Sequence, residues 1–369
     1  MKKLGFGTMR LPLKNASDPG SVDLYKTTEM FDYYLAEGFS YFDTAYFYHN
    51  QKSESVLGEV LVKRHARESY VLTDKLPIDY LHEKADVERI YNEQKKRLGI
   101  EYFDYYFMHA ISRERFDIAR DMGVLDFLEK KKAANEIRHI GFSFHGRPEE
   151  LEYILSQYKT ELVQIQLNYY DWFDSGVEAA RLHSIARSHG VELSIMEPLR
   201  GGSLADPPDE VRAALAAIVP GLSPAEAGLR FAASQDGIKV VLSGMSSLEQ
   251  VIENTNFMKN FEPLTADQLD KISHLNTMLD SCTKIKCTAC RYCVEGCPMN
   301  IAIPDYFSLY NKSEVFGLRM GYKNAYAKLA ADHGKASDCI SCGACESVCT
   351  QGLPVSALMA EVSARFDKK

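Results

Sequence analysis

The sequence predicts an α/β protein in two parts: a (β/α)8 barrel followed by a small, mostly helical domain. Two observations predict this arrangement. Short runs rich in β-branched and aromatic residues alternate with helical patterns over residues 1–275, and all nine cysteines lie between Cys282 and Cys349. The chain has 369 residues, and at about 150 residues per domain this length suits one large and one smaller domain. We therefore expect a barrel over residues 1–275 and a second domain over residues 276–369.

Strands alternate regularly with helices in the first part. The expected strands cover residues 4–8, 40–42, 70–72, 103–108, 137–142, 163–166, 192–196 and 239–242. Helical periodicity is clear, for example, over residues 22–37, 53–63, 85–98 and 177–189. Eight strands alternating with helices over about 270 residues are typical of a (β/α)8 barrel. A doubly wound sheet is the alternative, but it needs a glycine-rich phosphate turn, and Gly5-x-Gly7 has no third glycine.

Composition excludes several classes of protein. There are 43 Lys and Arg residues against 51 Asp and Glu residues, a net charge of −8, whereas a nucleic-acid-binding surface normally shows a basic excess. No segment approaches the roughly 18 consecutive apolar residues of a membrane span. The first residues include two lysines but no apolar core of a secretory signal. We therefore expect a cytoplasmic protein with neither a nucleic acid nor a membrane as partner.

The cysteines form two similar runs. In each run the spacing is C-x2-C-x2-C-x3-C, and the runs are Cys287, Cys290, Cys293, Cys297 and Cys339, Cys342, Cys345, Cys349. This is the spacing of bacterial ferredoxins, in which three close cysteines bind one iron–sulfur cluster and the fourth binds the other. It predicts two 4Fe–4S clusters, the first on Cys287, Cys290, Cys293 and Cys349 and the second on Cys339, Cys342, Cys345 and Cys297.

Zinc is the alternative to iron and sulfur, because paired C-x2-C motifs also suit a tetrahedral zinc site. Zinc sites use two pairs, however, whereas each run here has four cysteines and the run occurs twice. Cys282 is left over and is expected to be an unligated thiol. Helical periodicity covers residues 306–310, 324–331 and 355–366. The module thus resembles the helical two-cluster ferredoxin domains fused to redox enzymes, and one-electron transfer is its expected role. The alternative is that the clusters only stabilise the fold.

Chemistry in a barrel collects where the strands end, at the face built from the strand-to-helix loops. Just after the expected strands stand Asp43, Thr44, Tyr48, Lys75, His109, Ser143, Gln164, Gln166, Glu197, Arg200, Ser243 and Gly244. Four of them, Asp43, Tyr48, Lys75 and His109, form a set suited to proton transfer. Each alone is more often structural, but together on one rim they predict an active site.

Several short motifs on these strands match one family. They are Leu4-Gly5-Phe6-Gly7-Thr8, Asp43-Thr44-Ala45-x-x-Tyr48, Thr73-Asp74-Lys75, Met108-His109, Gly141-x-Ser143, Val163-Gln164-x-Gln166 and Glu253-Asn254. Together they resemble the aldo/keto reductases over nearly all of residues 1–275. The resemblance implies a barrel that binds NADPH or NADH in extended form and reduces a small-molecule carbonyl, or oxidises an alcohol. It also implies that Asp43, Tyr48, Lys75 and His109 are the catalytic tetrad.

The tetrad has a physical logic of its own. A carbonyl that accepts hydride develops alkoxide charge and needs a donor already placed at its oxygen. Tyr48 is the expected donor, and a nearby Lys75 ammonium would lower its pKa from about 10. Asp43 would hold that lysine charged and oriented, and His109 would hydrogen-bond the carbonyl oxygen.

The resemblance also implies nucleotide contacts, but this chain departs from the family at several of them. The implied contacts are Gly7, Thr8, Ser143, Gln164, Leu199, Gly201, Gly244, Gln250, Glu253 and Asn254. Phe144 replaces an asparagine, Met196 replaces an aromatic residue, and Gly244 and Gln250 replace the Lys and Arg that hold a 2′-phosphate. The choice between NADPH and NADH is therefore open. Glu197 and Arg200 suit either a ligand contact or a structural salt bridge.

Hydride transfer moves two electrons and each cluster moves one, and the sequence has no clear flavin motif. Three functions are therefore consistent with it. The first is a conventional carbonyl reductase or alcohol dehydrogenase whose clusters are an electron port or an appendage. The second is one-electron reduction of a substrate in the barrel by the clusters, without nicotinamide. The third is an electron-transfer protein that docks a redox partner protein.

Overall fold

The computed structural model describes residues 2–15, 18–281, 284–285, 287, 291–349 and 352–367. These residues fall into two units, one within residues 1–201 and 221–273 and the other within residues 202–220 and 274–369. None of the helices in the described part of the chain combines the length and apolar character of a membrane span. Cys282 and Cys290, two of the cysteines considered above, lie outside the described residues.

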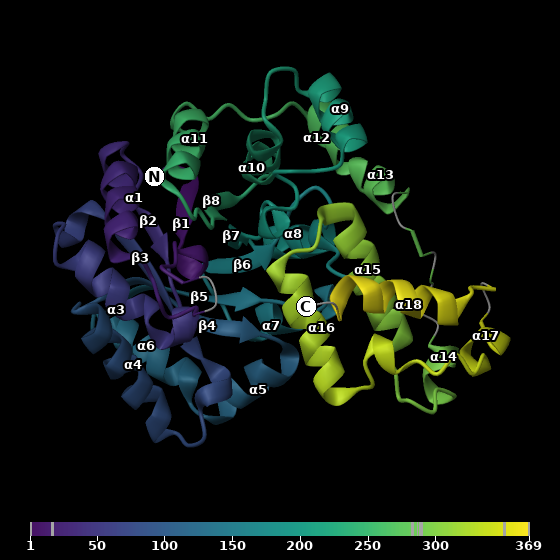
Figure 1. Ribbon diagram of the computed structural model, residues 1–369. Helices are drawn as coiled ribbons and strands as arrows, with labels where there is room; N and C mark the ends of the chain where they lie inside the picture. Colours follow the sequence, from purple (N-terminus) through teal and green to yellow (C-terminus); the bar gives the residue numbers. More distant parts are fainter. Residues whose placement is uncertain are drawn as a thin grey trace. The chain divides into compact units, whose positions relative to one another are not determined.

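Eight parallel strands close into a barrel in the first unit, with every strand paired to its neighbours in chain order and β8 paired to β1 (Figure 1). The strands are β1 (Leu4–Gly7), β2 (Tyr41–Asp43), β3 (Val71–Pro77), β4 (Phe103–Ile111), β5 (Ile137–Phe144), β6 (Leu162–Gln166), β7 (Glu192–Met196) and β8 (Ile238–Ser243). The predicted (β/α)8 barrel is confirmed.

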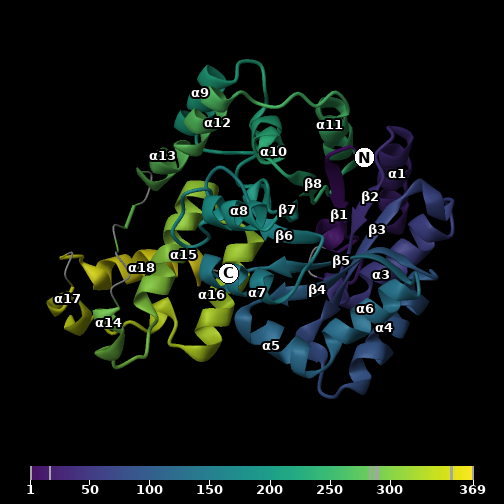
Figure 2. The same cartoon turned by 180° about the vertical axis from the view of Figure 1, so that it is seen from behind.

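The helices of this unit lie outside the strands, as Figures 1 and 2 show from opposite sides. They are α1 (Leu24–Ala36), α2 (Tyr48–Gln51), α3 (Ser53–Leu57), α4 (Ala85–Leu98), α5 (Arg113–Asp121), α6 (Val124–Ala133), α7 (Pro148–Gln157), α8 (Ala179–Ser188), α10 (Pro224–Ser234), α11 (Leu248–Lys259) and α12 (Ala266–Ser273). Short 3₁₀ turns cover Thr8–Arg10, Arg67–Ser69, Ile78–Tyr80 and Arg200–Gly202, and a π turn covers Gly58–Val62. The helix expected over residues 53–63 is thus an α-helix followed by a π turn.

The barrel interior is filled by large side chains and close backbone contacts. Tyr41, Tyr105 and Phe107 pack there with Leu162, Val240 and Leu242. Gly141 on β5 makes this packing possible, because a Cβ atom there would lie 2.4 Å from the Leu162 carbonyl oxygen and 2.4 Å from Cε1 of Phe107. A filled interior leaves the chemistry to the carboxyl-terminal ends of the strands.

Several strands run further than the sequence pattern predicts, so Asp43, Ser143 and Ser243 lie within β2, β5 and β8 and not just after them. The two longest extensions move two further candidate residues. β3 continues to Pro77 and β4 to Ile111, so Lys75 and His109 lie within strands and not just after them. The expectation that they follow their strands was therefore wrong. β2, in contrast, ends at Asp43, which is paired with Thr73. β3 therefore extends beyond its neighbour β2 at the position of Lys75.

The second unit is helical. Its helices are α9 (Asp209–Ile218), α13 (Leu275–Ser281), α14 (Tyr292–Glu295), α15 (Ile303–Phe316), α16 (Met320–Asp332), α17 (Ala344–Ser347) and α18 (Val355–Phe366), with a 3₁₀ turn at Ala336–Asp338. The helical segments expected over residues 306–310, 324–331 and 355–366 lie in α15, α16 and α18. Tyr306, Phe307, Met359 and Val362 form the centre of its own hydrophobic core.

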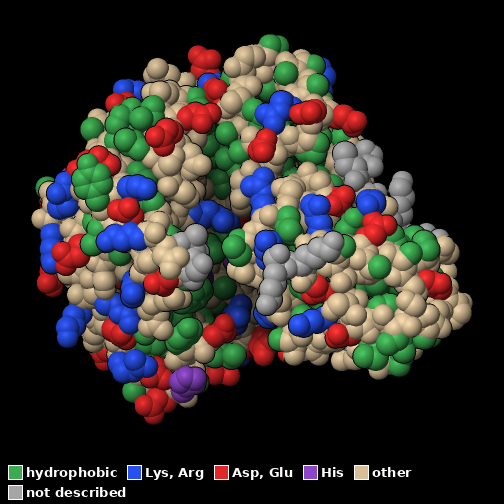
Figure 3. Space-filling model, viewed as in Figure 1, with side chains coloured by type: hydrophobic (Ala, Val, Ile, Leu, Met, Phe, Trp, Pro, Cys, Tyr) green, Lys and Arg blue, Asp and Glu red, His purple; other side chains and the backbone are tan. Residues whose placement is uncertain are grey.

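Charges of both signs are interspersed on the face of the molecule that Figure 3 shows. Lys and Arg side chains are spread among the acidic ones on this face.

Candidate active site

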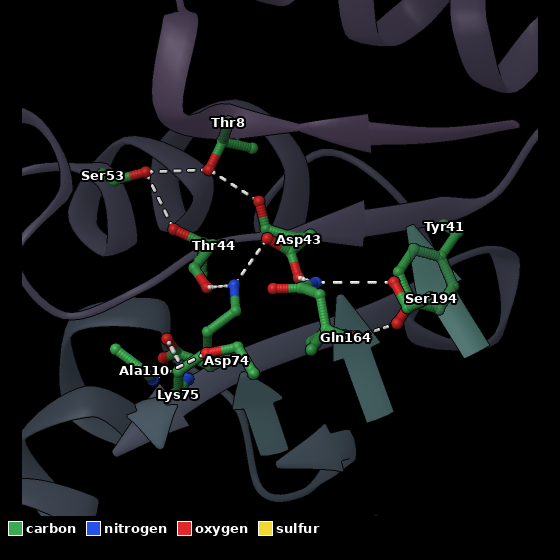
Figure 4. Close-up of polar contacts among 12 residues, drawn as sticks. Thr8, Tyr41, Asp43, Thr44, Ser53, Asp74, Lys75, Ala110, Gln164 and Ser194 are labelled. Atoms are coloured by element: carbon green, nitrogen blue, oxygen red, sulfur yellow. Dashed lines mark hydrogen bonds and ion pairs between the residues drawn. The ribbon is translucent and has the colours of Figure 1, made fainter. Parts of the chain in front are cut away.

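A buried ion pair joins the ends of two neighbouring strands. Lys75 on β3 is fully buried and Asp43 at the end of β2 is 3% exposed. Nζ of Lys75 lies 2.5 Å from Oδ1 of Asp43 and donates to the Thr44 carbonyl oxygen at 2.8 Å (Figure 4). Burial is the largest single influence and favours the neutral amine, but the charges of Asp43, Tyr48 and Asp74 and the hydrogen bond to Asp43 together outweigh it, and the pKa of Lys75 is raised above its ordinary value. The lysine is therefore a fixed ammonium.

Gln164 on β6 holds the other oxygen of Asp43. Its Nε2 donates to Oδ2 of Asp43 at 3.0 Å and to Oγ of Ser194 at 3.4 Å, as Figure 4 shows. Both oxygens of the carboxylate are thus occupied by protein donors, which fixes its orientation. The resemblance assigned Gln164 to a nicotinamide carboxamide; in this structure its amide nitrogen is engaged with the protein.

Tyr48 is presented by an unusual turn. It begins α2, and the three residues that follow, His49, Asn50 and Gln51, all have φ between 53° and 64°. The ring nitrogens of His49 each lie 2.9 Å from a carbonyl oxygen, one of Pro19 and one of Thr8. Left-handed backbone costs about 1–2 kcal/mol for a residue other than glycine. The turn therefore needs the anchoring that His49 provides.

The environment of Tyr48 keeps its hydroxyl protonated. Nζ of Lys75 lies 5.4 Å from the centroid of the Tyr48 ring. Burial raises the pKa of Tyr48, Lys75 opposes the rise, and Asp43 adds to it, so the pKa lies above the ordinary value. Lys75 acts in the expected direction, but the expected net lowering of the Tyr48 pKa was wrong because burial outweighs the ammonium. A protonated phenol is a proton donor at neutral pH.

His109 is a neutral imidazole in the same wall. It is 7% exposed, and the ring of Phe47 stacks on it at 4.6 Å with an interplanar angle of 3°. Burial lowers the pKa of His109 well below its ordinary value, and the charges of Lys75 and His145 lower it further. Its Nδ1 is buried without a hydrogen-bond partner among the described residues. A neutral imidazole can donate one hydrogen bond to a substrate oxygen.

These groups meet at one cavity. Its volume is about 470 Å³, and Asp43, Tyr48, His109 and Gln164 line it. Lys75 lies behind the wall, against Asp43. The structure therefore brings together all four residues of the predicted tetrad. It adds lining residues that the sequence did not single out, namely Met9, Arg10, Phe47, Ala110 and His145.

The predicted nucleotide contacts divide into two groups. Gly7, Gln164 and Gly244 line the cavity. The remaining ones lie outside its lining, and five of those use their side chains within the protein: Thr8 with Asp43, Ser143 with Ala110, Gln250 with Ser246, Glu253 with Ser223, and Asn254 with Ser243. Leu199 and Gly201 also lie outside the lining of the cavity. The structure thus places the first group, and not the whole set, beside the tetrad.

Arg10 and Glu197 form an ion pair at the cavity, 2.9 Å between Nη2 and Oε1. Arg10 follows β1 and Glu197 follows β7, and β8 pairs with both of those strands. The pair therefore bridges the end of β8, where a Cβ atom on Gly244 would lie 2.9 Å from Cδ of Arg10. Arg200 pairs with Asp171 at 3.4 Å. Glu197 and Arg200 each form a salt bridge, and Glu197 also lines the cavity.

The described cysteines of the second unit lie around two cavities. Cys287, Cys293 and Cys349 line one of them. Cys297, Cys339, Cys342 and Cys345 line the other. For the described cysteines this is the division that the spacing predicts, with Cys349 beside Cys287 and Cys293, and Cys297 beside the three close cysteines of the second run. Apolar residues complete both walls, and Ile303 lines both.

The fourth cysteine of each run also accepts a hydrogen bond from a backbone N–H group. The N–H of Ile301 donates to Sγ of Cys297 at 3.5 Å, and the N–H of Leu353 donates to Sγ of Cys349 at 3.4 Å. Such bonds tune iron–sulfur clusters. Within the described ranges, no three His, Cys, Asp or Glu side chains group closely enough to hold a single metal ion.

The closed barrel thus carries a lysine, a carboxylate, a phenol and an imidazole together at one end of its strands. Residues 3–277 match the model of the aldo/keto reductase family, and this chain belongs to that family. Residues 286–353 match the 4Fe-4S dicluster domain. The protein is an oxidoreductase that carries an iron–sulfur domain.

Known proteins resemble the barrel part. An L-galactose dehydrogenase of Arabidopsis thaliana is 27% identical over 264 residues, which cover 66% of this chain and 81% of the relative. The holo form of an aldo-keto reductase from Bacillus halodurans has a TM-score of 0.61 at 24% identity, over 74% of this chain and 91% of that chain. An aldo/keto reductase from Klebsiella pneumoniae in complex with NADP and acetate has a TM-score of 0.58 at 20% identity, over 74% and 91% of the two chains. The two structures support the fold.

Proposed function

We propose that this protein reduces a small-molecule carbonyl to an alcohol, or catalyses the reverse reaction, with a nicotinamide nucleotide as the hydride carrier and iron–sulfur clusters as an electron-transfer route. The observation that carries the proposal is the fixed Lys75–Asp43 pair next to Tyr48 and His109 in one cavity. Membership of the aldo/keto reductase family agrees with it.

Each residue of the tetrad has a different role in the proposed reaction. Tyr48, protonated at neutral pH, donates its proton to the substrate oxygen as negative charge develops there. Lys75 stabilises the phenolate that Tyr48 becomes, because its ammonium lies over the face of that ring. Asp43 keeps the ammonium charged and in place. His109 donates a hydrogen bond to the same oxygen and orients it. Proton transfer by a positioned group contributes about 10²- to 10⁴-fold in rate.

The cavity also fits the nicotinamide end of a nucleotide. Gly7, Gly244 and Gln164 line it beside Tyr48, and two glycines leave room for a flat ring close to the backbone. A bound reduced nicotinamide nucleotide would supply the hydride that forms the new C–H bond of the alcohol, and the nucleotide would be oxidised. The Klebsiella pneumoniae relative was solved with NADP, which supports this assignment.

For the second domain we propose two 4Fe–4S clusters and a boundary near residue 275. Cys287, Cys290, Cys293 and Cys349 would bind the first cluster, and Cys297, Cys339, Cys342 and Cys345 the second. The match to a 4Fe-4S dicluster domain and the grouping of cysteines around two apolar cavities support this. The thiolates would hold iron, which passes one electron at a time to or from a redox partner protein.

Reduction by the clusters without nicotinamide is a second candidate, and a particular observation favours it. Arg10 is the only Lys or Arg among the residues found to line the cavity, and Glu197 already neutralises it. A nucleotide carries several phosphate charges, which a protein normally meets with cations or with helix N-termini. A pocket without a free cation binds an uncharged substrate more readily.

One assay distinguishes the two candidates. Anaerobic protein with reconstituted clusters is mixed with NADPH, with NADH or with a low-potential one-electron donor, each with a panel of carbonyls. Carbonyl-dependent oxidation of either nucleotide supports the main proposal. Reoxidation of reduced clusters by the carbonyl, without nucleotide binding, supports the second candidate.

Tyr48→Phe is the matched variant for this assay, because it removes a single oxygen from the site. We expect it to bind nucleotide as the wild type does and to lose about 10²- to 10⁴-fold in turnover. Unchanged turnover in Tyr48→Phe would contradict the assignment of the proton donor.

A further inference from the structure

Two acidic side chains are buried directly behind the catalytic lysine. Glu54 on α3 and Asp74 on β3 are both fully buried, and their carboxyl groups are near enough for each to shift the pKa of the other. Neither touches the cavity, so the mechanism above does not use them. Burying a carboxyl group destabilises a protein unless the group is paired. We therefore expect a role for these two residues near Lys75.

The pair takes the place of a missing strand partner. β2 ends at Asp43, so β3 has no strand on that side at Lys75. Oδ1 of Asp74 accepts the backbone N–H of Lys75 at 2.8 Å, and Nε2 of Gln94 donates to the Lys75 carbonyl oxygen at 3.1 Å. Gln94 on α4 also donates to Oε1 of Glu54 at 2.8 Å. Side chains of the pair and of Gln94 thus satisfy both backbone groups of the catalytic lysine.

A hydrogen bond between two such carboxyl groups requires a proton on one of them, since two carboxylates are both acceptors. Arg97 and Gln94 both donate to Glu54, the former at 2.8 Å to Oε2, so Glu54 is the ionised partner. Oδ2 of Asp74 is buried, and among the described residues no donor faces it. An oxygen without a donor is the one that carries its own proton. Burial and the charge of Glu54 raise the pKa of Asp74 well above its ordinary value, in agreement with this assignment.

We propose that Asp74 is a neutral carboxylic acid that donates its proton to the Glu54 carboxylate, and that this pair is a positioning device for Lys75. Asp74 is therefore a positioning residue. The positioning role, but not the shared proton, rests on the function proposed above.

Further contacts link the device to the rest of the site. Ser53, next to Glu54, bonds to the hydroxyls of Thr8 and Thr44 at 3.1 and 2.8 Å, and Thr8 donates to the Asp43 carbonyl oxygen (Figure 4). α3 is therefore tied to β1, β2 and β3 at the point where the tetrad assembles. A displacement of about 1 Å in such a site can cost about 10²-fold in rate.

Groups from every neighbouring element face the pair. Arg97 from α4 balances the charge of Glu54. Lys75 from β3 and Tyr106 from β4 complete the surroundings, and the Tyr106 hydroxyl donates to Gln94. With one proton on the pair, its single negative charge matches the single positive charge of Arg97. Loss of that proton at alkaline pH would place two carboxylates side by side in a buried site.

The test compares Asp74→Asn with Asp74→Leu in the full-length protein with reconstituted clusters. Asparagine keeps the oxygen that accepts the Lys75 N–H and provides an N–H that replaces the acidic proton, whereas leucine has the same size and neither group. Infrared spectra at neutral pH should show the carbonyl stretch of a protonated carboxyl in the wild type and lack it in Asp74→Asn. That band should disappear at alkaline pH.

Positioning is measured in two ways. In crystals, Nζ of Lys75 should stay within roughly 3 Å of Asp43 in Asp74→Asn and move away in Asp74→Leu, whether or not the protein reduces carbonyls. Turnover should stay within about 3-fold of the wild type in Asp74→Asn and fall about 10-fold or more in Asp74→Leu, with nucleotide affinity unchanged. Absence of the Asp74-dependent band, or an asparagine variant as displaced as the leucine variant, would overturn the proposal.

Discussion

The buried pair of Lys75 and Asp43 gives a prediction about stability that can be worked out from the structure. Replacing Lys75 with Met keeps the length of the side chain and removes its charge. Asp43, 3% exposed, would then keep Gln164 as a donor at 3.0 Å but lose its counter-charge at 2.5 Å. Removing one partner of a buried ion pair typically costs about 3–5 kcal/mol. We expect Lys75→Met to lower the free energy of unfolding of the barrel by that amount.

Trp172 makes the measurement specific to the barrel. It is the only tryptophan of the chain, it belongs to the first unit, and its ring packs against Phe231 and His183. Urea unfolding followed by its fluorescence therefore reports the barrel and not the cluster domain. This matters because proteins with several domains or with bound clusters do not unfold in one step.

A double-mutant cycle supplies the control. In Lys75→Met/Asp43→Asn neither charge is left, so we expect the double variant to recover at least about half of the loss, since residues in contact are not additive. The pKa of Lys75 is raised in the folded state, so its contribution is fully present below the unfolded lysine pKa and is lost as pH rises through the raised value. The gap between wild type and variant should thus be constant from pH 7 to 9. A loss under about 1 kcal/mol, or a double variant as unstable as the sum of the single ones, would refute this reasoning.

Three further predictions concern other parts of the molecule. The pKa of His109 is well below its ordinary value, so below about pH 6.5 the unfolded chain binds an extra proton and the free energy of unfolding of the barrel falls by up to about 1.4 kcal/mol per pH unit. His109→Gln should reduce this fall when unfolding is followed by Trp172 fluorescence at pH 5 and 7. An equally steep fall in the variant would contradict the prediction. Cys345→Ser should lower the iron content from about 8 to about 4 atoms per chain, measured by iron analysis after reconstitution, and an unchanged content would mean that Cys345 is not a ligand. Gly141→Ala should destabilise the barrel by about 1–3 kcal/mol, because its Cβ would meet the Leu162 carbonyl oxygen at 2.4 Å; a neutral effect would show that β5 and β6 can shift apart.

Periodicity predicted the strands well because a parallel barrel buries each of them between core and helices. All eight expected strands are present, but their ends are not where the pattern placed them. β3 and β4 extend past the apolar runs through Lys75 and His109. Polar residues end a sequence pattern, whereas here the strands continue through them; Lys75, for example, has buried partners for its ammonium and its backbone groups. At the active site the apolar pattern in the sequence therefore ends before the strand itself ends.

Other features depend on contacts between distant residues and leave little trace in the sequence. Arg10 and Glu197 are 187 positions apart, and only the barrel closure brings their strands to either side of β8. The pKa of Tyr48 depends on the balance between burial and Lys75, which no motif records. Asp74 stands in the motif Thr73-Asp74-Lys75, but its role requires Glu54 and Gln94 from two separate helices.

The left-handed turn after Tyr48 has a consequence for engineering. Three consecutive residues other than glycine adopt it, at about 1–2 kcal/mol each. This backbone strain lowers the free energy of unfolding of the barrel. Gln51→Gly would remove part of that strain and at the same time make the backbone that follows Tyr48 more flexible. Thermostability and turnover would then trade against each other at a position that contacts no substrate.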